Sequence, residues 1–455
     1  MLLRTKLFGK TYDFPDLRVL MGKANEEKSG DRLAGLAADN DAERAAARLV
    51  LAEVPLWALR ENPAVPYDED EVTRVIHDAL NETVYAEIRG WTVGELREWI
   101  LDDRNEGPAL QRLANGLTAE MVAAVTKLMS NLDLAYAASR IRIQRHSVNS
   151  IGQEGRLSGR LQPNHPTDSP EGIRAAIYEG LSYGCGDAVI GINPSDDSYA
   201  SVARLLDMTY GVVRTWEIPT QTCVLAHVTT QMRCLQAGSP VGLVFQSICG
   251  SQKGNESFGI SVGMLDEAHR LARKHCYPQG PDFMYFETGQ GSALSAGAHN
   301  GWDQLTLEAR NYGLARRWSP FLVNTVVGFI GPEYLYDTEQ IHRAGLEDHF
   351  MGKLTGVSMG CDVCYTNHAR TGQNSSENLA LLLAAAGCNF FMGVPQADDA
   401  MLSYQSTSFH DIATLRQMLR LRPAPEFEQW LEALGLMRDG RLTAKAGDPT
   451  FFLSR

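Results

Sequence analysis

The sequence predicts an α/β protein in which a (β/α)8 TIM barrel follows a mainly helical N-terminal domain. Eight short apolar or β-branched runs lie between residues 156 and 394, and helical segments alternate with them. The connections are too long for hairpins, which indicates parallel strands, and eight such units favour a closed barrel over an open sheet. No GxGxxG motif opens a helix after the first run, which disfavours a dinucleotide-binding fold.

Composition and charge exclude several classes of protein. Of the 455 residues, 44% are hydrophobic and 21% are charged, as in ordinary globular proteins. The net charge of −13 argues against a general nucleic-acid or anionic-membrane binder. No apolar run reaches the ~18 residues that span a bilayer, and the N-terminus lacks the apolar region of a secretory signal. We therefore expect a cytoplasmic protein with no nucleic-acid and no membrane partner.

Eight cysteines are scattered between residues 185 and 388. A chain of this length can bury a core without disulfides, so we expect reduced thiols in an intracellular protein. Cys361 and Cys364 form a single CxxC, without a second pair or a His pair at zinc spacing. A zinc or redox role for this pair is therefore disfavoured.

Residues 1–150 have a helical pattern, apart from residues 4–14, which can form a small hairpin. Thr92 and Glu95 have the spacing of a capping box, with an apolar helical face after them. Residues 117–138 predict one long helix that begins at Thr118. The acidic run at 67–71 is interpreted as a solvated helix start.

Residues 151–396 form the predicted barrel, and residues 397–455 form a predicted helical tail. Amphipathic helices are expected between the strands, as at 172–184. The tail contains helical segments at 409–421 and 426–436, and its last residues are apolar enough to pack against the protein. The eight predicted strands lie within residues 156–162, 187–193, 222–228, 241–248, 283–289, 323–331, 354–362 and 388–394.

The stretch 283–301 shows how a barrel strand would enter an active site. Its apolar run FMYF stops at the carboxylate Glu287, and a loop of Gly, Ser and Ala follows. Such a loop lets a large ligand lie against the backbone, and active sites of these barrels lie at the C-terminal ends of the strands. Glu287 is therefore expected at the mouth of the barrel.

The other strands also end in polar or otherwise notable residues. We expect a pocket for a small polar, cationic ligand, because one mouth would bring together two carboxylates, a guanidinium, two amides and an imidazole. A purely structural network in which Arg160 pairs with Glu287 or Asp362 is the alternative. The strand-end residues are Arg160, Gln162, Asn193, Pro194, His227, Gln246, Ser247, Glu287, Phe329, Asp362 and Met392.

Several common chemistries find little support in this set. Two carboxylates could form a glycosidase pair, but aromatic platforms for sugar are not evident near Glu287 and Asp362. They could bind a divalent metal, but few hard ligands accompany them, and no HxH or HExxH motif is present. No lysine stands at a strand end for a Schiff base. These observations favour chemistry carried by a bound cofactor, with no metal site in the protein itself.

Long motifs in this region resemble the large subunit of ethanolamine ammonia-lyase. They include GDAVIGINP, TQTCVLAHVTTQ, FQSICGSQKG, YFETGQGSALSAG, NTVVGFIGPEYLY and SMGCDVCYTNHA, and the similarity runs from Arg4 to Phe452. The resemblance implies an adenosylcobalamin-dependent radical lyase that converts ethanolamine to acetaldehyde and ammonia. The DxHxxG signature of base-off cobalamin proteins is absent. Asp266 and His269 are three positions apart, and the glycine of the signature does not follow them. The resemblance therefore implies base-on cobalamin.

The resemblance also implies roles for individual residues. The substrate would be held by Arg160, Gln162, Asn193, Glu287 and Asp362, of which Arg160, Glu287 and Asp362 are the implied catalytic residues. Cobalamin contacts are implied at Pro194, Gln246, Ser295 and Met401. The main chain at Phe329 is a further expected contact.

The resemblance implies a small subunit that covers the cobalamin, and large subunits that associate within a hetero-oligomer. A location inside a bacterial microcompartment stays open. Two other readings also stay open: a metal- or acid/base-dependent barrel lyase or aldolase, and a non-catalytic scaffold subunit. Cobalamin dependence distinguishes the first of these, and an activity assay distinguishes the second.

Overall fold

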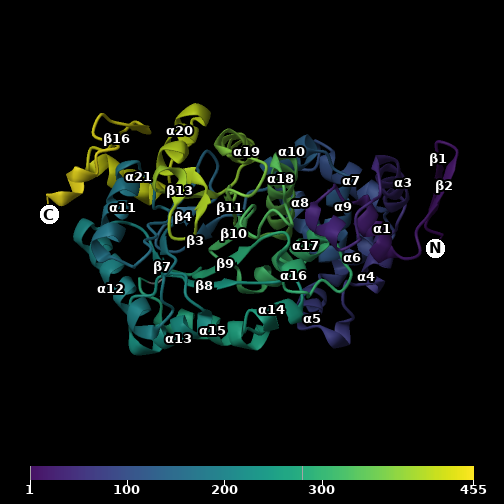
Figure 1. Ribbon diagram of the computed structural model, residues 1–455, viewed down its shortest axis with the longest axis horizontal. Helices are drawn as coiled ribbons and strands as arrows, with labels where there is room; N and C mark the ends of the chain where they lie inside the picture. Colours follow the sequence, from purple (N-terminus) through teal and green to yellow (C-terminus); the bar gives the residue numbers. More distant parts are fainter. Residues whose placement is uncertain (1, 279, 455) are drawn as a thin grey trace.

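The computed structural model describes residues 2–278 and 280–454. The N-terminal helices lie at one end of the molecule, the barrel lies in the middle, and the C-terminal segment lies at the other end (Figure 1). The two termini are therefore at opposite ends of the long axis.

Eight parallel strands form the barrel, and the predicted fold is confirmed. Each strand falls within one of the predicted runs, apart from one residue at the start of β10. Neighbouring strands pair in chain order, and β12 pairs with β5 through Phe390↔Ser158 to Gly393↔Leu161. The strands are β5 (Ser158–Leu161), β6 (Val189–Ile192), β7 (Thr222–Val224), β8 (Val244–Ser247), β9 (Met284–Thr288), β10 (Leu322–Val326), β11 (Met359–Asp362) and β12 (Phe390–Val394).

Helices cover the outside of the barrel (Figure 1). They follow the strands along the chain, as the alternating pattern predicts. The main covering helices are α11 (Pro170–Ser182), α12 (Tyr199–Trp216), α13 (Val228–Ala237), α15 (Val262–His275), α17 (Gln304–Ala315), α18 (Thr338–Thr355), α19 (Gln373–Ala385) and α20 (Phe409–Leu419). Shorter helices are α14 (Gln252–Ser257) and α16 (Ser292–Ser295).

The ring of strands has one junction without a strand ladder, between β7 and β8. There the amides of Gly242 and Leu243 both donate to the carbonyl of Thr222. The side chain of Gln231 donates to the carbonyls of Ala226 and Phe245, each at 2.7 Å, and accepts from the amide of Phe245 at 2.9 Å. A glutamine side chain thus supplies the hydrogen bonds that a strand neighbour would otherwise supply.

The N-terminal region agrees with its predicted hairpin and capping box. Strands β1 (Arg4–Leu7) and β2 (Lys10–Asp13) pair antiparallel. Thr92 and Glu95 cap α7 (Val93–Leu101) in both directions. The preceding and following helices are α1 (Leu17–Ala24), α2 (Ser29–Leu33), α3 (Asp41–Ala52), α4 (Leu56–Glu61), α5 (Glu71–Asp78), α6 (Glu82–Ile88) and α8 (Gly107–Ala114).

The single long helix predicted at 117–138 is wrong. The structure has two helices there, α9 (Ala119–Lys127) and α10 (Asn131–Ser139). Ser130 begins the second with its own capping box to Asp133, because its hydroxyl accepts from the Asp133 amide and competes with helix continuation. Thr118 stands at the start of α9 as predicted, but its hydroxyl makes no capping bond.

The acidic run at 67–71 is solvated only in part. Asp68 and Glu69 are exposed, whereas Asp70 is 1% exposed and caps α5. The prediction is wrong for Asp70, because its carboxylate pairs with Arg310 of α17 at 2.8 Å.

The end of the chain packs against the barrel helices, as its apolar composition predicts. Phe452 is fully buried. Its ring centroid lies 4.9 Å from that of Trp216 and 5.4 Å from that of Tyr178. Helix α21 (Pro425–Ala433) and the short 3-10 helix at Pro449–Leu453 complete this region.

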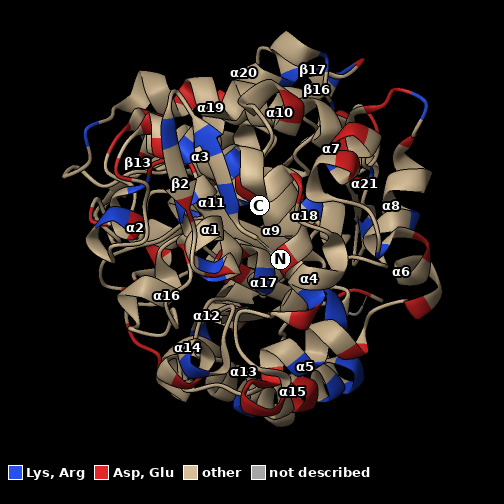
Figure 2. Cartoon of the chain, turned by 90° about the vertical axis from the view of Figure 1, so that its right-hand side faces the viewer, with Lys and Arg blue, Asp and Glu red and all other residues tan. Residues whose placement is uncertain are grey.

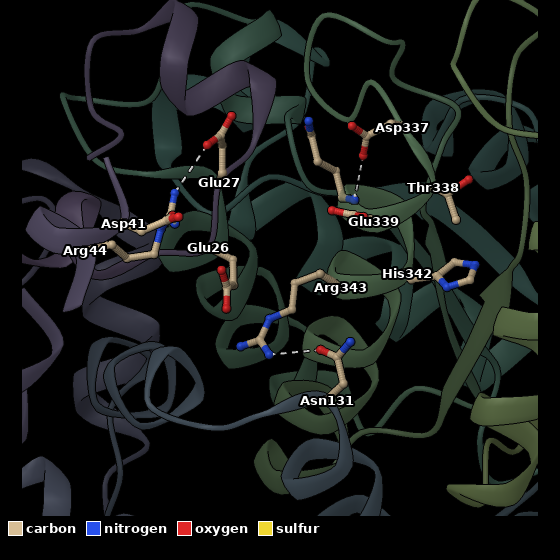
Figure 3. Close-up of a pocket in the computed structure, with 11 residues that line it drawn as sticks. Glu26, Glu27, Asp41, Arg44, Asn131, Asp337, Thr338, Glu339, His342 and Arg343 are labelled. Carbon is tan, nitrogen blue, oxygen red and sulfur yellow. Dashed lines mark hydrogen bonds and ion pairs between the residues drawn. The ribbon is translucent and has the colours of Figure 1, made fainter. Parts of the chain in front are cut away.

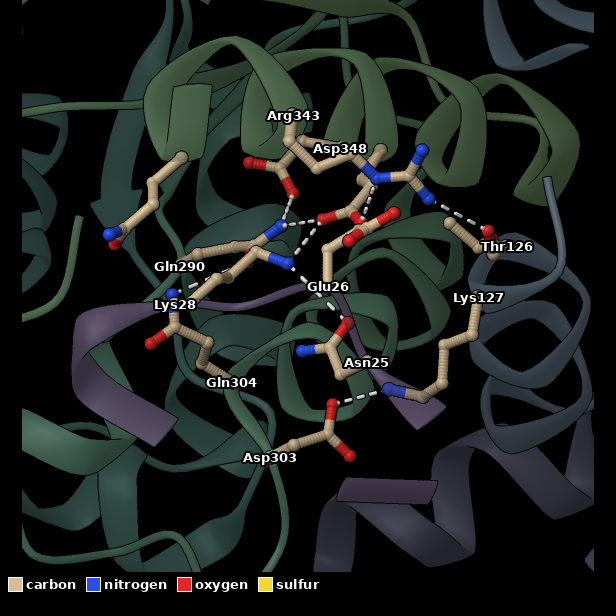
Figure 4. Close-up of polar contacts among 12 residues, drawn as sticks. Asn25, Glu26, Lys28, Thr126, Lys127, Gln290, Asp303, Gln304, Arg343 and Asp348 are labelled. Carbon is tan, nitrogen blue, oxygen red and sulfur yellow. Dashed lines mark hydrogen bonds and ion pairs between the residues drawn. The ribbon is translucent and has the colours of Figure 1, made fainter. Parts of the chain in front are cut away.

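Buried ion pairs join the N-terminal helices to the barrel (Figure 4). Lys28 pairs with Glu347 at 2.9 Å and Lys127 with Asp303 at 2.5 Å, and all four side chains are fully buried. Arg310, from the barrel side, pairs with Glu120 at 2.6 Å. Buried charges are tolerated only when they are paired and hydrogen-bonded, so these contacts fix how the two parts meet.

The outer surface carries both signs of charge. Viewed from the end of the N-terminal helices, Lys and Arg are interspersed with Asp and Glu (Figure 2). Among residues 2–278 and 280–454, no helix is long and apolar enough to cross a membrane.

Replacing Lys28 by Met should destabilise the protein strongly. Burial raises the pKa of Glu347, but Lys28 and Arg343 outweigh it and lower this pKa to about 2, so the loss of Lys28 removes the largest influence that keeps this buried carboxylate ionised. Breaking such a pair costs about 3–5 kcal/mol. Urea unfolding at pH 7 measures the loss.

Lys23→Met is the matched control, because Lys23 pairs with Glu43 and with the exposed Asp39. It should cost no more than about 1 kcal/mol. Adding Glu347→Gln to Lys28→Met should restore part of the stability. Equal losses in the two single variants would contradict a structural role for the buried pair.

Candidate functional site

A cavity of about 500 Å³ opens at the C-terminal ends of the barrel strands. It contains both carboxylates predicted at the mouth, Glu287 and Asp362, together with apolar side chains. These two carboxylates therefore lie together at the mouth of the barrel, as their positions at strand ends predict. The predicted residues that line the cavity are Gln162, Asn193, Gln246, Ser247, Glu287, Phe329, Asp362 and Met392.

Arg160 is fully buried and does not itself line the cavity, but it lies next to Gln162 and Glu287, which do. Its Nη1 donates to Oε1 of Gln162, and its Nη2 is 4.0 Å from Oε1 of Glu287. Burial opposes its charge, but Tyr285 and Glu287 favour it, and the pKa of Arg160 is raised overall. Its Nε and Nη2 have no hydrogen-bond partner among the described residues. Buried donors of this kind need an acceptor, so the guanidinium is suited to bind a ligand.

Glu287 is the penultimate residue of strand β9, and its side chain is 15% exposed. Its Oε1 accepts from the hydroxyl of Tyr285 at 2.6 Å and from the amide of Asn324 at 3.4 Å. Tyr285 is two residues away and on the same face of the strand, so local strand geometry orients the carboxylate. The second oxygen, Oε2, makes no hydrogen bond within the described chain.

Asp362 ends strand β11 and is fully buried. The hydroxyl of Tyr404 donates to its Oδ2 at 2.9 Å, and the hydroxyl of Ser406 donates to its Oδ1. Burial raises the pKa of Asp362 to about 7, although the two hydroxyls and Arg160 act in the opposite direction. The carboxyl therefore changes charge near neutral pH.

Some predicted residues lie outside the cavity lining. Pro194 and Met401 are half-buried and Ser295 is exposed, and none of these three predicted cobalamin contacts lines the cavity. His227 caps α13, and its Nε2 lies 3.0 Å from the carbonyl of Phe258. The imidazole expected in the pocket is therefore absent from its lining, because it is engaged by the backbone outside.

Within residues 398–408, sequence reasoning named only Met401 and missed Asp399, Tyr404 and Ser406. Asp399 accepts from the amide of Gln162 at 2.7 Å and from Asn164 at 2.8 Å. Tyr404 accepts from Gln162 at 2.9 Å. These residues follow the last barrel strand at no regular spacing, so the sequence carries no periodic signal for them.

The expectation that aromatic platforms are not evident near the carboxylates is wrong. Phe245 and Phe258 line the cavity together with Phe329 and Tyr404. The last two rings meet edge to face at 5.3 Å. Phe245 lies inside β8, between Val244 and Gln246, and Phe258 follows α14, so neither stands at the end of a strand.

The mouth of the cavity is suited to a large ligand, in addition to the small cationic ligand expected inside the cavity. Phe329 is 40% exposed at its edge, and Gln246 lines the cavity with its amide hydrogen-bonded to the backbone of Val228 and Ser247. The loop after β9 adds small residues, and at Gly297 even an added Cβ would meet nothing within 4 Å. Apolar, amide and small-residue surfaces around one open mouth fit a broad, flat cofactor with amide side chains.

A second cleft, of about 580 Å³, lies between the N-terminal helices and the start of α18 (Figure 3). Acidic residues outnumber the two arginines in its lining, and both arginines are paired within the protein. Arg44 pairs with Glu27 and Asp41, and Arg343 donates to Asn131 at 3.0 Å. Since these arginines bind groups of the protein itself, the cleft is interpreted as part of the interface between the N-terminal helices and the barrel.

Replacing Asp362 by Asn should change how stability depends on pH. The folded-state pKa is raised from 3.8 to about 7, so its contribution to stability is present below pH 4 and is lost as pH rises to 7. The stability of the variant relative to wild type should therefore increase over this window, by up to about 4 kcal/mol. Denaturant unfolding from pH 4 to 8 measures it, with the exposed Asp39→Asn as control. A difference that stays constant over this range would contradict the prediction.

Comparisons with known proteins agree with this geometry. A family model described as "Ethanolamine ammonia lyase large subunit (EutB)" matches residues 12–445. The ethanolamine ammonia-lyase large subunit of Escherichia coli (strain K12) is 56% identical over 452 residues, which is 99% of this chain and 100% of that protein. The protein of the same name from Salmonella typhimurium (strain LT2) has the same identity and coverage. The chain belongs to the ethanolamine ammonia-lyase large subunit family.

Proposed function

We propose that this chain is the catalytic large subunit of an adenosylcobalamin-dependent ethanolamine ammonia-lyase, a carbon–nitrogen lyase that forms acetaldehyde and ammonia. The carrying observation is the buried guanidinium of Arg160, whose Nε and Nη2 have no hydrogen-bond partner among the described residues, beside a cavity that contains two carboxylates. Full-length similarity to relatives with this name supports the substrate.

The charges of the cavity match the two ends of ethanolamine. Asp362 and Glu287 attract the ammonium, and Oε1 of Gln162 can accept a further hydrogen bond from it. Arg160 and Asn193 donate to the hydroxyl oxygen. Arg160 keeps its proton at any working pH, so it orients the hydroxyl and takes no part in proton transfer.

The substrate is held so that its carbon atoms face the mouth. Adenosylcobalamin bound there would supply the radical chemistry of the reaction. Gln246, Pro194, Ser295, Met401 and the main chain at Phe329 would hold the cofactor. The protein contributes orientation and exclusion of water, which are the main levers of a protein in cofactor chemistry.

A small subunit is the proposed partner. The relatives are named large subunits, and the exposed ring of Phe329 lies at the edge of an open mouth. A second chain over this mouth would cover the outer face of the cobalamin. We propose that large subunits also associate within this hetero-oligomer, in the cytoplasm, either free or in a microcompartment.

Ammonia release from ethanolamine should require both adenosylcobalamin and the small subunit. The chain is co-expressed with the adjacent small subunit, and ammonia is measured with and without cofactor. The isolated chain should bind cobalamin weakly, because one face of the corrin is left open to water. Activity without cobalamin that a chelator abolishes would favour the metal-dependent lyase instead, and no activity in any combination would favour the scaffold.

Glu287→Gln should reduce the rate of ammonia release by one to two decades or more. The change keeps the size of the side chain but removes the charge opposite the ammonium, an interaction worth ~1.5–3 kcal/mol at ~1.4 kcal/mol per decade. The loss should appear in kcat as well as KM, because a displaced carbon no longer meets the radical.

The visible spectrum of bound cobalamin and the folded state should stay unchanged in Glu287→Gln. Glu333→Gln is the control, since Glu333 is an exposed glutamate in the loop after β10. Near wild-type turnover by Glu287→Gln would show that Glu287 does not bind the substrate. Loss of cobalamin or of the fold would show that its role is structural.

A further inference from the structure

Residues 398–408, which follow the last barrel strand, are held at the cavity by backbone hydrogen bonds. Strands β13 (Asp398–Asp399) and β14 (Tyr404–Gln405) form a small hairpin, and β15 (Thr407–Ser408) pairs parallel with β12. Tyr365, just after β11, exchanges backbone hydrogen bonds with Gln405 at 2.9 and 3.0 Å. The segment is thus tied to the ends of two neighbouring strands, and Tyr404 is held at 1% exposure.

The hydroxyl of Tyr404 connects two of the proposed substrate residues in a fixed direction. Oε1 of Gln162 accepts from Arg160, so its Nε2 provides the two donors. One is given to Asp399 at 2.7 Å and the other to the Tyr404 oxygen at 2.9 Å. The single proton of Tyr404 is then directed to Oδ2 of Asp362, at 2.9 Å. Every group in this chain of hydrogen bonds has one consistent role.

Ser406 completes the support of the carboxylate. Its hydroxyl donates to Oδ1 of Asp362, so each oxygen of that carboxylate receives one hydroxyl proton from the same segment. A carboxylate oxygen has two acceptor positions, which leaves one on each for a ligand. Hydroxyl donors stabilise the ionised form, which is the form that binds a cation.

We propose that Tyr404 and Ser406 are positioning residues that hold Asp362 as an oriented carboxylate for the ammonium of the substrate, while Tyr404 also fixes the direction of the Gln162 amide. The inference rests on the proposed function for the identity of the substrate. Neither residue needs to touch the reacting atoms. The edge-to-face contact of Tyr404 with Phe329 keeps its ring in place.

The charges around Asp362 give this arrangement a signature in pH. Arg160 faces it from β5 and favours the ionised form, whereas Glu287 from β9 disfavours it. Cys361 precedes it on β11 and Cys364 follows just after the strand, and burial raises the pKa of both thiols well above the usual value, so both stay neutral. The Cys364 thiol also hydrogen-bonds Asp362, but the hydroxyls of Ser406 and Tyr404 are the groups that lower the pKa of Asp362 most. Removing either hydroxyl should raise the pKa of Asp362 further above about 7.

The test uses Tyr404→Phe and Ser406→Ala in the complex with the small subunit. For Tyr404→Phe the ring contact with Phe329 is kept and only the hydroxyl is lost. We expect kcat/KM for ethanolamine to fall about tenfold to a hundredfold at pH 7. The acid limb of its pH profile should move to higher pH, so that part of the loss is recovered at alkaline pH. The spectrum of bound cobalamin should not change.

Tyr365→Phe is the matched control. Tyr365 is a buried tyrosine whose backbone makes the two hydrogen bonds with Gln405 described above. Its hydroxyl makes no hydrogen bond within the described chain. Its pH profile should coincide with that of wild type. A loss in Tyr404→Phe that is the same at every pH would overturn the proposal, because a merely structural role predicts that result.

A second measurement does not depend on activity. The carboxyl carbon of Asp362 is titrated by 13C NMR in the chain itself, with Asp362→Asn to assign the signal. Its pKa should rise in Tyr404→Phe and in Ser406→Ala but not in Tyr365→Phe, and an unchanged pKa would overturn the proposal. If Tyr404→Phe fails to fold, Ser406→Ala decides. If wild type releases no ammonia, the proposed function fails, and the titration still judges the positioning role.

Discussion

A permanent positive charge inside the barrel governs the geometry of the cavity. The guanidinium of Arg160 is fully buried and cannot lose its proton, so negative groups must lie nearby. Glu287 and Asp362 provide this charge from strands on either side of β10. Two carboxylates against one guanidinium leave a surplus negative charge when Asp362 is ionised. The empty acceptor positions are thus suited to a small cation, and a neutral or anionic ligand of the same size would be disfavoured.

The barrel and most of its mouth could be predicted from the sequence, for a physical reason. Parallel strands connected by helices are buried on both faces, so each leaves a short apolar run that ends where the polar mouth begins. Glu287 and Asp362 both stand at such ends. Arg160 and Gln162 are two residues apart on β5 and therefore point the same way. The regular geometry of strands therefore allowed these residues to be predicted from the sequence.

What could not be predicted depends on partners far away in sequence. Tyr404 and Ser406 reach Asp362 across about forty residues of chain, with no periodic pattern to mark them. Asp70 is similar to its exposed neighbours in type, and only Arg310, 240 positions later, explains its burial. The break at Ser130 is local, and its capping box with Asp133 could have revealed it. Tertiary charge pairing leaves no comparable local sign.

The junction between β7 and β8 has a mechanical consequence. Seven of the eight contacts around the ring are backbone ladders, whose spacing is fixed, whereas this one depends on the side chain of Gln231 and on two amides. Oε1 of Gln246 spans the same junction to the amide of Val228 at 3.0 Å. A side chain has rotamers that a backbone lacks, so the stiffness of the barrel is lowest along this wall. Its circumference can adjust there, beside the mouth, while the strands that hold Arg160, Glu287 and Asp362 keep their registration.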